Sequence, residues 1–204
     1  MIAFTDLTGL ASSAIVLTAV ATWLSGMVRL GKIQRMLLAS VVTIAALIPL
    51  GSLPLAAYLR GAIGDLSIPS LLLLLLSMAC ALFGWRQPSS SSRTALQVLV
   101  VLAAAVLYPM ALGIGLFDPY RLGYGSSWFL GFLLLLALAA WFWRLYWVAW
   151  SLALAVLAWG IGWYESANLW DYLLDPLLAV YALGALVKQN MAKEKGLTAK
   201  HRLS

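Results

Sequence analysis

Long runs of apolar residues, separated by short polar turns, make up almost all of this chain. An α-helix needs about 20 apolar residues to cross roughly 30 Å of hydrocarbon. Inside hydrocarbon, every backbone N–H and C=O must find its partner within its own segment, so apolar runs of this length are expected to be helices. The runs cover residues 7–27, 37–57, 68–85, 95–117, 128–143, 145–163 and 173–187.

The composition supports the same class of protein. Hydrophobic residues make up 64% of the 204 residues and charged residues only 10%, whereas a soluble domain has roughly 25% charged residues. The sequence therefore predicts an all-α, polytopic integral membrane protein with seven transmembrane helices. Residues 1–187 are predicted to form one transmembrane helical domain, and residues 188–204 a basic cytoplasmic tail.

The positive charges alternate from turn to turn along the chain. Every Lys and Arg except Arg60 and Arg121 is in the first, third or fifth turn or in the C-terminal tail. Every acidic residue except Glu194 is in one of the other turns or at the N-terminus. The positive-inside rule then predicts an external N-terminus and a cytoplasmic C-terminus. The cytoplasmic cations are Arg29, Lys32, Arg35, Arg86, Arg93, Arg144, Lys188, Lys193, Lys195, Lys200 and Arg202.

The fifth turn, at Arg144, has the weakest local signal, because it lacks proline and glycine. A single helix over residues 128–164 would be about 55 Å long, well beyond the hydrocarbon thickness. It would also place the basic tail outside. We therefore predict a tight turn at Arg144, within an interfacial belt of aromatic residues.

The scarcity of reactive side chains limits the chemistry. The chain has one cysteine, Cys80, and one histidine, His201, so it offers neither a Cys/His metal set nor a paired nucleophile and histidine base. We predict no catalytic residues, no metal and no cofactor. No cation precedes the first apolar run, which is therefore expected to be retained rather than cleaved as a signal peptide. The net charge of +6 is scattered over turns, so no nucleic-acid partner is expected.

Three polar segments on the predicted outer side hold the candidate binding residues: 58–67, 118–127 and 164–175. Carboxylates interleaved with Trp and Tyr can receive polyols, amines or a cation, and the aromatic faces can stack on a ligand. The candidates are Arg60, Asp65, Asp118, Tyr120, Arg121, Tyr124, Tyr164, Glu165, Asn168, Trp170, Asp171 and Asp175.

Spacing in the third polar segment suggests a shared face. Asn168, Asp171 and Asp175 follow an i, i+3, i+7 pattern, which brings all three to one side if the segment is helical. Asp175 also precedes Pro176, an arrangement typical of a helix N-cap. Capping of the last helix is therefore an alternative role for Asp175.

The other two segments have similar alternatives. Asp118 precedes Pro119 and is expected to start a turn through an Asx-type hydrogen bond. Arg60 and Asp65 are close enough in sequence to form an ion pair. Arg60 and Arg121 are predicted either to neutralise nearby carboxylates or to hold a phosphate or carboxylate of a lipid or substrate.

Three classes of function fit these features. We favour a non-enzymatic subunit of a bacterial inner membrane, whose outer, periplasmic face docks a partner protein or a lipid- or glycan-linked substrate in cell-envelope processes. The expected partners are the lipid bilayer and either a membrane protein or further copies of the chain. The first alternative is a small-solute transporter, since the predicted topology is similar to that of SWEET-type sugar carriers. The second is an enzyme acting on lipid headgroups at the outer leaflet.

Overall fold

The computed structural model describes residues 4–28, 30–114 and 117–201 and confirms the all-α prediction. Arg29 and Arg202, two of the cations used for the topology, lie outside the described residues. The helices are α1 (Phe4–Met27), α2 (Lys32–Leu47), α3 (Leu55–Ile63), α4 (Ile68–Phe83), α5 (Ser90–Ala111), α6 (Ser127–Phe142), α7 (Tyr146–Gly160), α8 (Trp170–Leu173) and α9 (Pro176–His201). A short 3-10 helix, η1 (Pro119–Gly123), and two short strands, β1 (Pro49–Leu50) and β2 (Leu53–Pro54), complete them.

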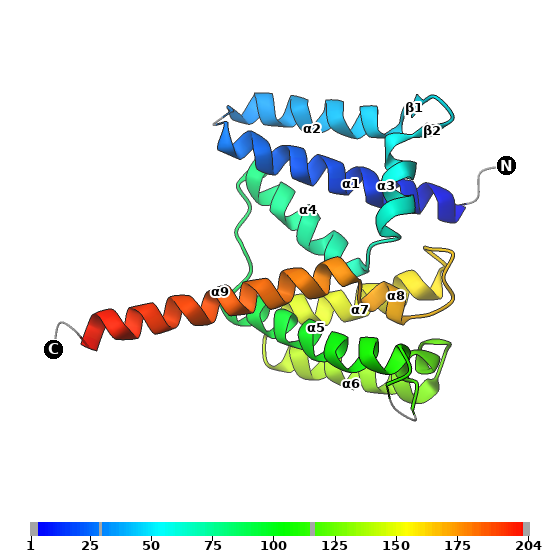
Figure 1. The fold of residues 1–204 in the computed structure, drawn as a ribbon, viewed down its shortest axis with the longest axis vertical. Coiled ribbons are helices and arrows are strands. Elements are labelled where there is room, and N and C mark those ends of the chain that lie inside the picture. Colours follow the sequence, from blue (N-terminus) through cyan, green and yellow to red (C-terminus); the bar gives the residue numbers. More distant parts are fainter. Residues whose placement is uncertain (1–3, 29, 115–116, 202–204) are drawn as a thin grey trace.

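The helices form two groups that follow the sequence (Figure 1). In the N-terminal group α1 packs on α2, α3 and α4; in the C-terminal group α5 packs on α9 and α7, and α6 packs on α7. Contacts of α4 with α7 and α8 join the two groups. By length and composition, α1 and α5 are the two helices of the described chain that can cross a membrane, while α4, α6 and α7 are apolar but shorter.

Small and hydroxylated residues fill the packing surfaces of the N-terminal group. Ala14, Ala46 and Ala56 form a buried cluster where α1, α2 and α3 meet. Thr18 and Thr43 share a hydrogen bond of 2.7 Å between α1 and α2. Small residues let helix backbones approach closely, and hydroxyl groups bridge them.

The second predicted helix, over residues 37–57, is interrupted in the structure. Helix α2 ends at Leu47, and β1 and β2 then form a tight hairpin in which Pro49 pairs with Pro54. Proline lacks the amide hydrogen that a helix interior needs, and Gly51 adopts a φ of +85° at the hairpin tip. The chain resumes as the separate helix α3.

The last helix is longer than its apolar run. Helix α9 continues from Pro176 to His201 without a break at Val187. The described part of the predicted basic tail is therefore an extension of the last helix.

The turn at Arg144 separates α6 from α7, as predicted. Arg144 has a φ of 60°, the left-handed conformation that commonly ends a helix. The amide of Leu145 donates to the carbonyl of Ala140 at 2.8 Å, and the amide of Arg144 donates to that of Trp141 at 3.0 Å. These two bonds form a Schellman motif, which closes α6 without a glycine.

The strain at this turn gives a direct test. Arg144→Gly is expected to be more stable than Arg144→Ala by about 1 kcal/mol, because only glycine adopts a positive φ without a steric penalty. Both variants remove the same charge, so each is the control for the other. Thermal unfolding in mild detergent measures the difference. Equal midpoints would contradict the left-handed turn.

Candidate functional site

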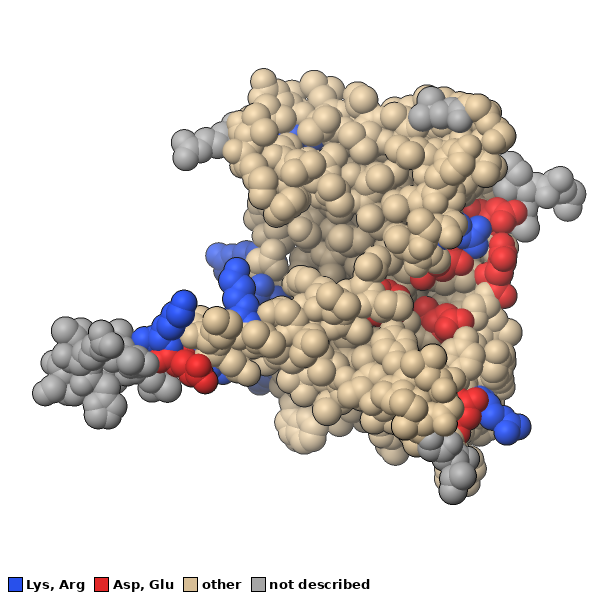
Figure 2. Space-filling model, in the orientation of Figure 1, with Lys and Arg blue, Asp and Glu red and all other residues tan. Residues whose placement is uncertain are grey.

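The three polar segments, 58–67, 118–127 and 164–175, meet at one end of the molecule. Figure 2 shows the acidic side chains gathered at this end, which is also the end of the N-terminus, and most cations at the opposite end. Among the described residues, Arg60 and Arg121 are the exceptions among the cations, and Glu194 is the exception among the acids. We call the three segments together the polar end.

Arg60 is the electrostatic centre of the first segment. Its Nε and Nη2 donate to the two carboxylate oxygens of Asp65 at 2.7 and 2.9 Å, a bidentate pair. Longer contacts of 3.5 Å reach Asp6 on α1 and Glu165 in the third segment. The hydrogen bond to Asp65 is the main cause that raises the pKa of Arg60 above its ordinary value, and burial opposes it. Arg60 therefore pairs with one nearby carboxylate and two that are distant in the chain, which is the first of the two roles predicted for it.

A glycine makes room for this guanidinium. Gly9 lies on α1 directly beneath Arg60, and a Cβ atom there would lie only 2.3 Å from Nε of Arg60. A side chain of any size at position 9 would displace the arginine. Gly9 was not among the predicted site residues, because nothing in its local sequence points to Arg60.

The second segment docks onto the third through η1. Asn168 donates from Nδ2 to the carbonyl of Tyr120 at 2.9 Å, and Trp170 donates from Nε1 to that of Pro119 at 2.9 Å. The amide of Leu169 donates to the carbonyl of Gly123 at 2.9 Å. Two predicted residues, Asn168 and Trp170, therefore hold the two segments together.

A carboxylate and a phenol lie at the same junction. The hydroxyl of Tyr120 donates to both oxygens of Asp171, at 3.1 and 3.0 Å, and the hydroxyl of Ser166 donates to Asp171 as well. Burial raises the pKa of Tyr120 above its ordinary value, and the neighbouring Asp171 charge raises it further. Tyr120 thus remains a neutral donor, and Asp171 is an occupied acceptor.

Two tyrosines, whose rings contact each other at a tilt, anchor the third segment. Tyr172 is completely buried; its hydroxyl accepts from the amide of Tyr164 at 3.0 Å and lies 3.0 Å from the carbonyl of Ser166. The hydroxyl of Tyr164 pairs with that of Ser12 on α1 at 2.9 Å. Burial raises the pKa of Tyr164 to about 12, although the Ser12 bond acts to lower it. Burial also raises the pKa of Tyr172.

Asp175 joins the two helix groups. One carboxylate oxygen accepts from the amide of Leu178 at 2.8 Å and so caps α9, as the Pro176 pattern indicated. The other accepts from the amide and hydroxyl of Ser67, at 3.0 and 2.6 Å, and from the hydroxyl of Ser70. Ser67 also caps α4. One buried carboxylate therefore caps α9 and binds the N-terminal end of α4.

The predicted shared face of Asn168, Asp171 and Asp175 is wrong. Helix α8 spans only four residues, Trp170–Leu173, and the chain is extended at Leu174. Asn168 consequently faces η1, Asp171 faces Tyr120, and Asp175 turns toward α4. The three residues make separate hydrogen bonds within the network of bonded side chains at the polar end, which we call the polar layer. They do not form one ligand set.

The other predicted residues are at the rim of the polar end. Asp118 accepts from the amide of Tyr120 at 3.0 Å, which is the expected Asx-type turn. Tyr124 stacks edge-on against Tyr120 but is 61% exposed, and Arg121 is exposed. The side chain of Glu165 is 63% exposed. These side chains remain accessible to a ligand or partner.

Several residues of this layer were missed by the sequence predictions. Ser67, Ser70, Ser166, Gly9 and Gly123 each contact a predicted residue. Only Ser67 had a usable local signal, since it precedes a helix that has proline in its first turn. The roles of the others depend on contacts between distant segments.

Comparison with known proteins finds no match: no family model, no curated protein and no solved structure corresponds to this chain. Within the described ranges, no group of three or more His, Cys, Asp or Glu side chains is placed to hold a metal ion.

Proposed function

We propose that this chain is a multi-pass protein of a bacterial inner membrane, without an active site of its own, whose polar end docks a partner. In this proposal the polar end faces the periplasm, and the partner is a protein or a lipid- or glycan-linked substrate of cell-envelope processes. The positive-inside bias supports the orientation. The main support for the docking role is that carboxylates of the polar layer are already hydrogen-bonded to other residues of the chain.

The distribution of side chains supports a lipid environment. Large apolar residues point outward over the helices, including Leu135 at 68%, Phe142 at 82% and Val180 at 72% exposure. On α1, by contrast, hydroxylated residues such as Ser13 and Thr18 are buried. Soluble proteins rarely expose extensive apolar surface, whereas small polar residues at helix contacts are typical of membrane bundles.

The pairing of the polar groups supports a binding surface rather than a reaction centre. Asp65, Asp171 and Asp175 are each engaged by two or more hydrogen-bond donors. Groups that are held in this way give the loops a fixed shape, and a rigid surface loses little conformational entropy on binding.

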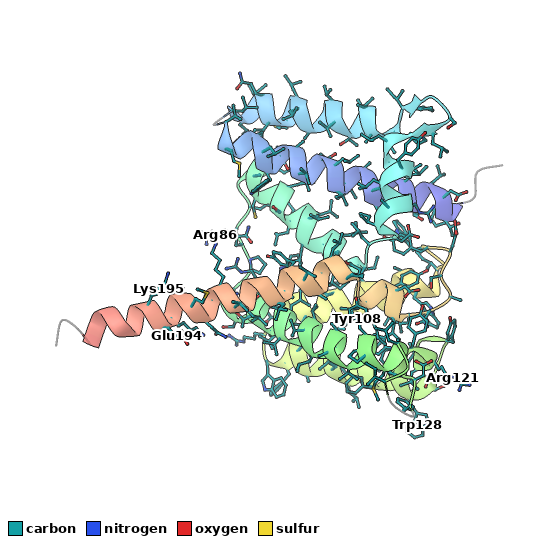
Figure 3. The ribbon with its side chains drawn as sticks, viewed as in Figure 1. Arg86, Tyr108, Arg121, Trp128, Glu194 and Lys195 are labelled. Atoms are coloured by element: carbon teal, nitrogen blue, oxygen red, sulfur yellow. The ribbon has the colours of Figure 1, made fainter. Side chains whose placement is uncertain are left out.

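The accessible side chains at the rim have the character of an interface. Tyr124 and Trp128 are 61% and 90% exposed, and Figure 3 shows Arg121 and Trp128 projecting at the same corner of the molecule. Tyrosine, tryptophan and arginine dominate the binding energy of protein interfaces. Together with Glu165, they offer a partner both aromatic and charged contacts.

Capture of a partner tests this proposal. Tagged protein, extracted in mild detergent, is expected to retain a stoichiometric partner that mass spectrometry identifies. Tyr124→Ala is expected to weaken the complex by about 1–2 kcal/mol, roughly five- to thirtyfold, if Tyr124 anchors the interface. The matched control is Tyr146→Ala, because Tyr146 is 46% exposed and also has one aromatic neighbour, but it lies at the opposite end.

Other outcomes would replace the proposal. A solitary protein that moves solute into vesicles would indicate the transporter, and one that turns over lipid headgroups would indicate the enzyme. An equal loss of partner in Tyr124→Ala and Tyr146→Ala would contradict docking at the polar end.

A further inference from the structure

A cavity of about 420 Å³ lies between the two helix groups and extends away from the polar layer, which it meets at Ser70. Its walls come chiefly from α4 and α9, which start side by side at the polar end and diverge toward the opposite end (Figure 1). Asp175 holds the narrow end of this wedge through its bonds to Ser67 and Ser70. The linker over residues 84–89 crosses the wide end, and Figure 2 shows the hollow with basic side chains at its margin. We call this cavity the wedge groove.

The wall chemistry changes along the wedge groove. Leu73, Leu74 and Leu177 provide apolar walls, whereas Gln87 and Arg93 line the end that carries the cations. Arg93 is exposed and forms no ion pair with the described residues. Arg86 is on the same linker as Gln87, at the wide end of the wedge (Figure 3). The groove thus combines a long apolar surface with the positive charge of Arg93 at one end.

We infer that the wedge groove holds one acyl chain of an anionic phospholipid, with its phosphate at Arg93. An acyl chain satisfies the apolar walls, and a phosphate supplies a negative charge for Arg93, which forms no ion pair with the described residues. Arginine is well suited to a phosphate because its planar guanidinium donates two parallel hydrogen bonds. The inference rests on the membrane location proposed above, and in that orientation the lipid belongs to the cytoplasmic leaflet.

A lipid in this position fills the space between two helix groups that are joined mainly at the polar end. Tyr181 and Leu177 on α9 are 56% and 50% exposed where they line the groove. The lipid would therefore fill the space between α4 and α9. The lipid species bound there would depend on the composition of the cytoplasmic leaflet.

Photolabelling tests the inference. The full-length protein is reconstituted in vesicles that contain phosphatidylglycerol with a photoreactive group near the end of one acyl chain, and labelled peptides are mapped by mass spectrometry. Label is expected on α4 and α9 at the groove. Arg93→Gln is expected to reduce it about fivefold, which corresponds to the roughly 1 kcal/mol that one cation contributes near an anionic surface.

Two further variants test whether the label depends on the wedge groove. Ser77 is exposed on the groove wall, so Ser77→Phe is expected to block the chain and reduce labelling at the groove. Arg121→Gln removes an exposed cation at the opposite end and is expected to leave labelling unchanged. Label spread evenly over all lipid-facing helices, or an equal loss in Arg121→Gln, would overturn the inference.

The same preparation separates this inference from the membrane proposal. Protein that an alkaline carbonate wash releases from the vesicles would overturn both. Protein that stays inserted but carries no label at the groove would overturn only the lipid site. A crosslink from α4 or α9 to a co-purified protein in place of lipid would also overturn it.

Discussion

Replacing Asp175 by alanine is expected to destabilise the protein by about 3 kcal/mol or more. The change removes the cap of α9, worth about 1 kcal/mol, and leaves the buried hydroxyls of Ser67 and Ser70 without their acceptor. Each unsatisfied buried group costs about 1–3 kcal/mol. Because these bonds also join the two helix groups, the loss is expected to appear as lower yield and a lower unfolding midpoint in mild detergent.

Two variants calibrate that result. Asp175→Asn keeps an oxygen acceptor of the same shape and is expected to lose clearly less stability than Asp175→Ala. Asp118→Ala removes a cap from the short helix η1 only, and is expected to cost about 1 kcal/mol or less. Similar losses in Asp175→Ala and Asp118→Ala would contradict the joining role of Asp175.

Gly123→Ala is expected to separate η1 from the third polar segment. A Cβ atom at position 123 would lie 1.8 Å from Oδ1 of Asn168 and 2.9 Å from Cδ1 of Trp170, distances that no adjustment of a few tenths of an ångström can relieve. The η1 helix must move away, which breaks its bonds to Asn168, Leu169 and Trp170. At about 1 kcal/mol for each bond, the expected loss is about 3 kcal/mol.

Hydrogen exchange locates the effect of this substitution. The amide of Leu169 donates to Gly123, so its protection is expected to fall in Gly123→Ala. Gly131→Ala is the matched control, because Gly131 lies within α6 and a Cβ there meets nothing within 4 Å. It is expected to be neutral or stabilising by up to about 1 kcal/mol. Unchanged protection at Leu169 in Gly123→Ala would show that η1 does not dock as described.

Features with a local cause could be predicted from the sequence. The apolar runs predicted helices, the charge bias and the length limit predicted the turn at Arg144, and an aspartate before a proline predicted the caps formed by Asp118 and Asp175. The Arg60–Asp65 ion pair could also be predicted, because only four residues lie between its partners. Each of these depends on neighbours in the chain.

Features that depend on distant segments could not be predicted. Asp175 meets Ser67 and Ser70 across 108 and 105 residues, and no pattern in either segment indicates the other. The shared face assigned to the third polar segment failed because tertiary contacts with η1 and α4 outweigh the helical periodicity of so short a stretch. The break after α2 does have a local signal, because Pro49, Gly51 and Pro54 interrupt the apolar run over residues 37–57.

The unequal lengths of the helices have a consequence for the surrounding bilayer in the setting proposed above. At 1.5 Å per residue, the 24 residues of α1 and the 22 of α5 give lengths of about 36 and 33 Å, against about 24 Å for α4 and α6 and about 23 Å for α7. A hydrocarbon layer of about 30 Å matches neither set, and a bilayer responds to short helices by thinning. Lipid beside α6 and α7 would then be compressed while lipid beside α1 and α5 is not. The thickness of the bilayer would therefore vary around the protein.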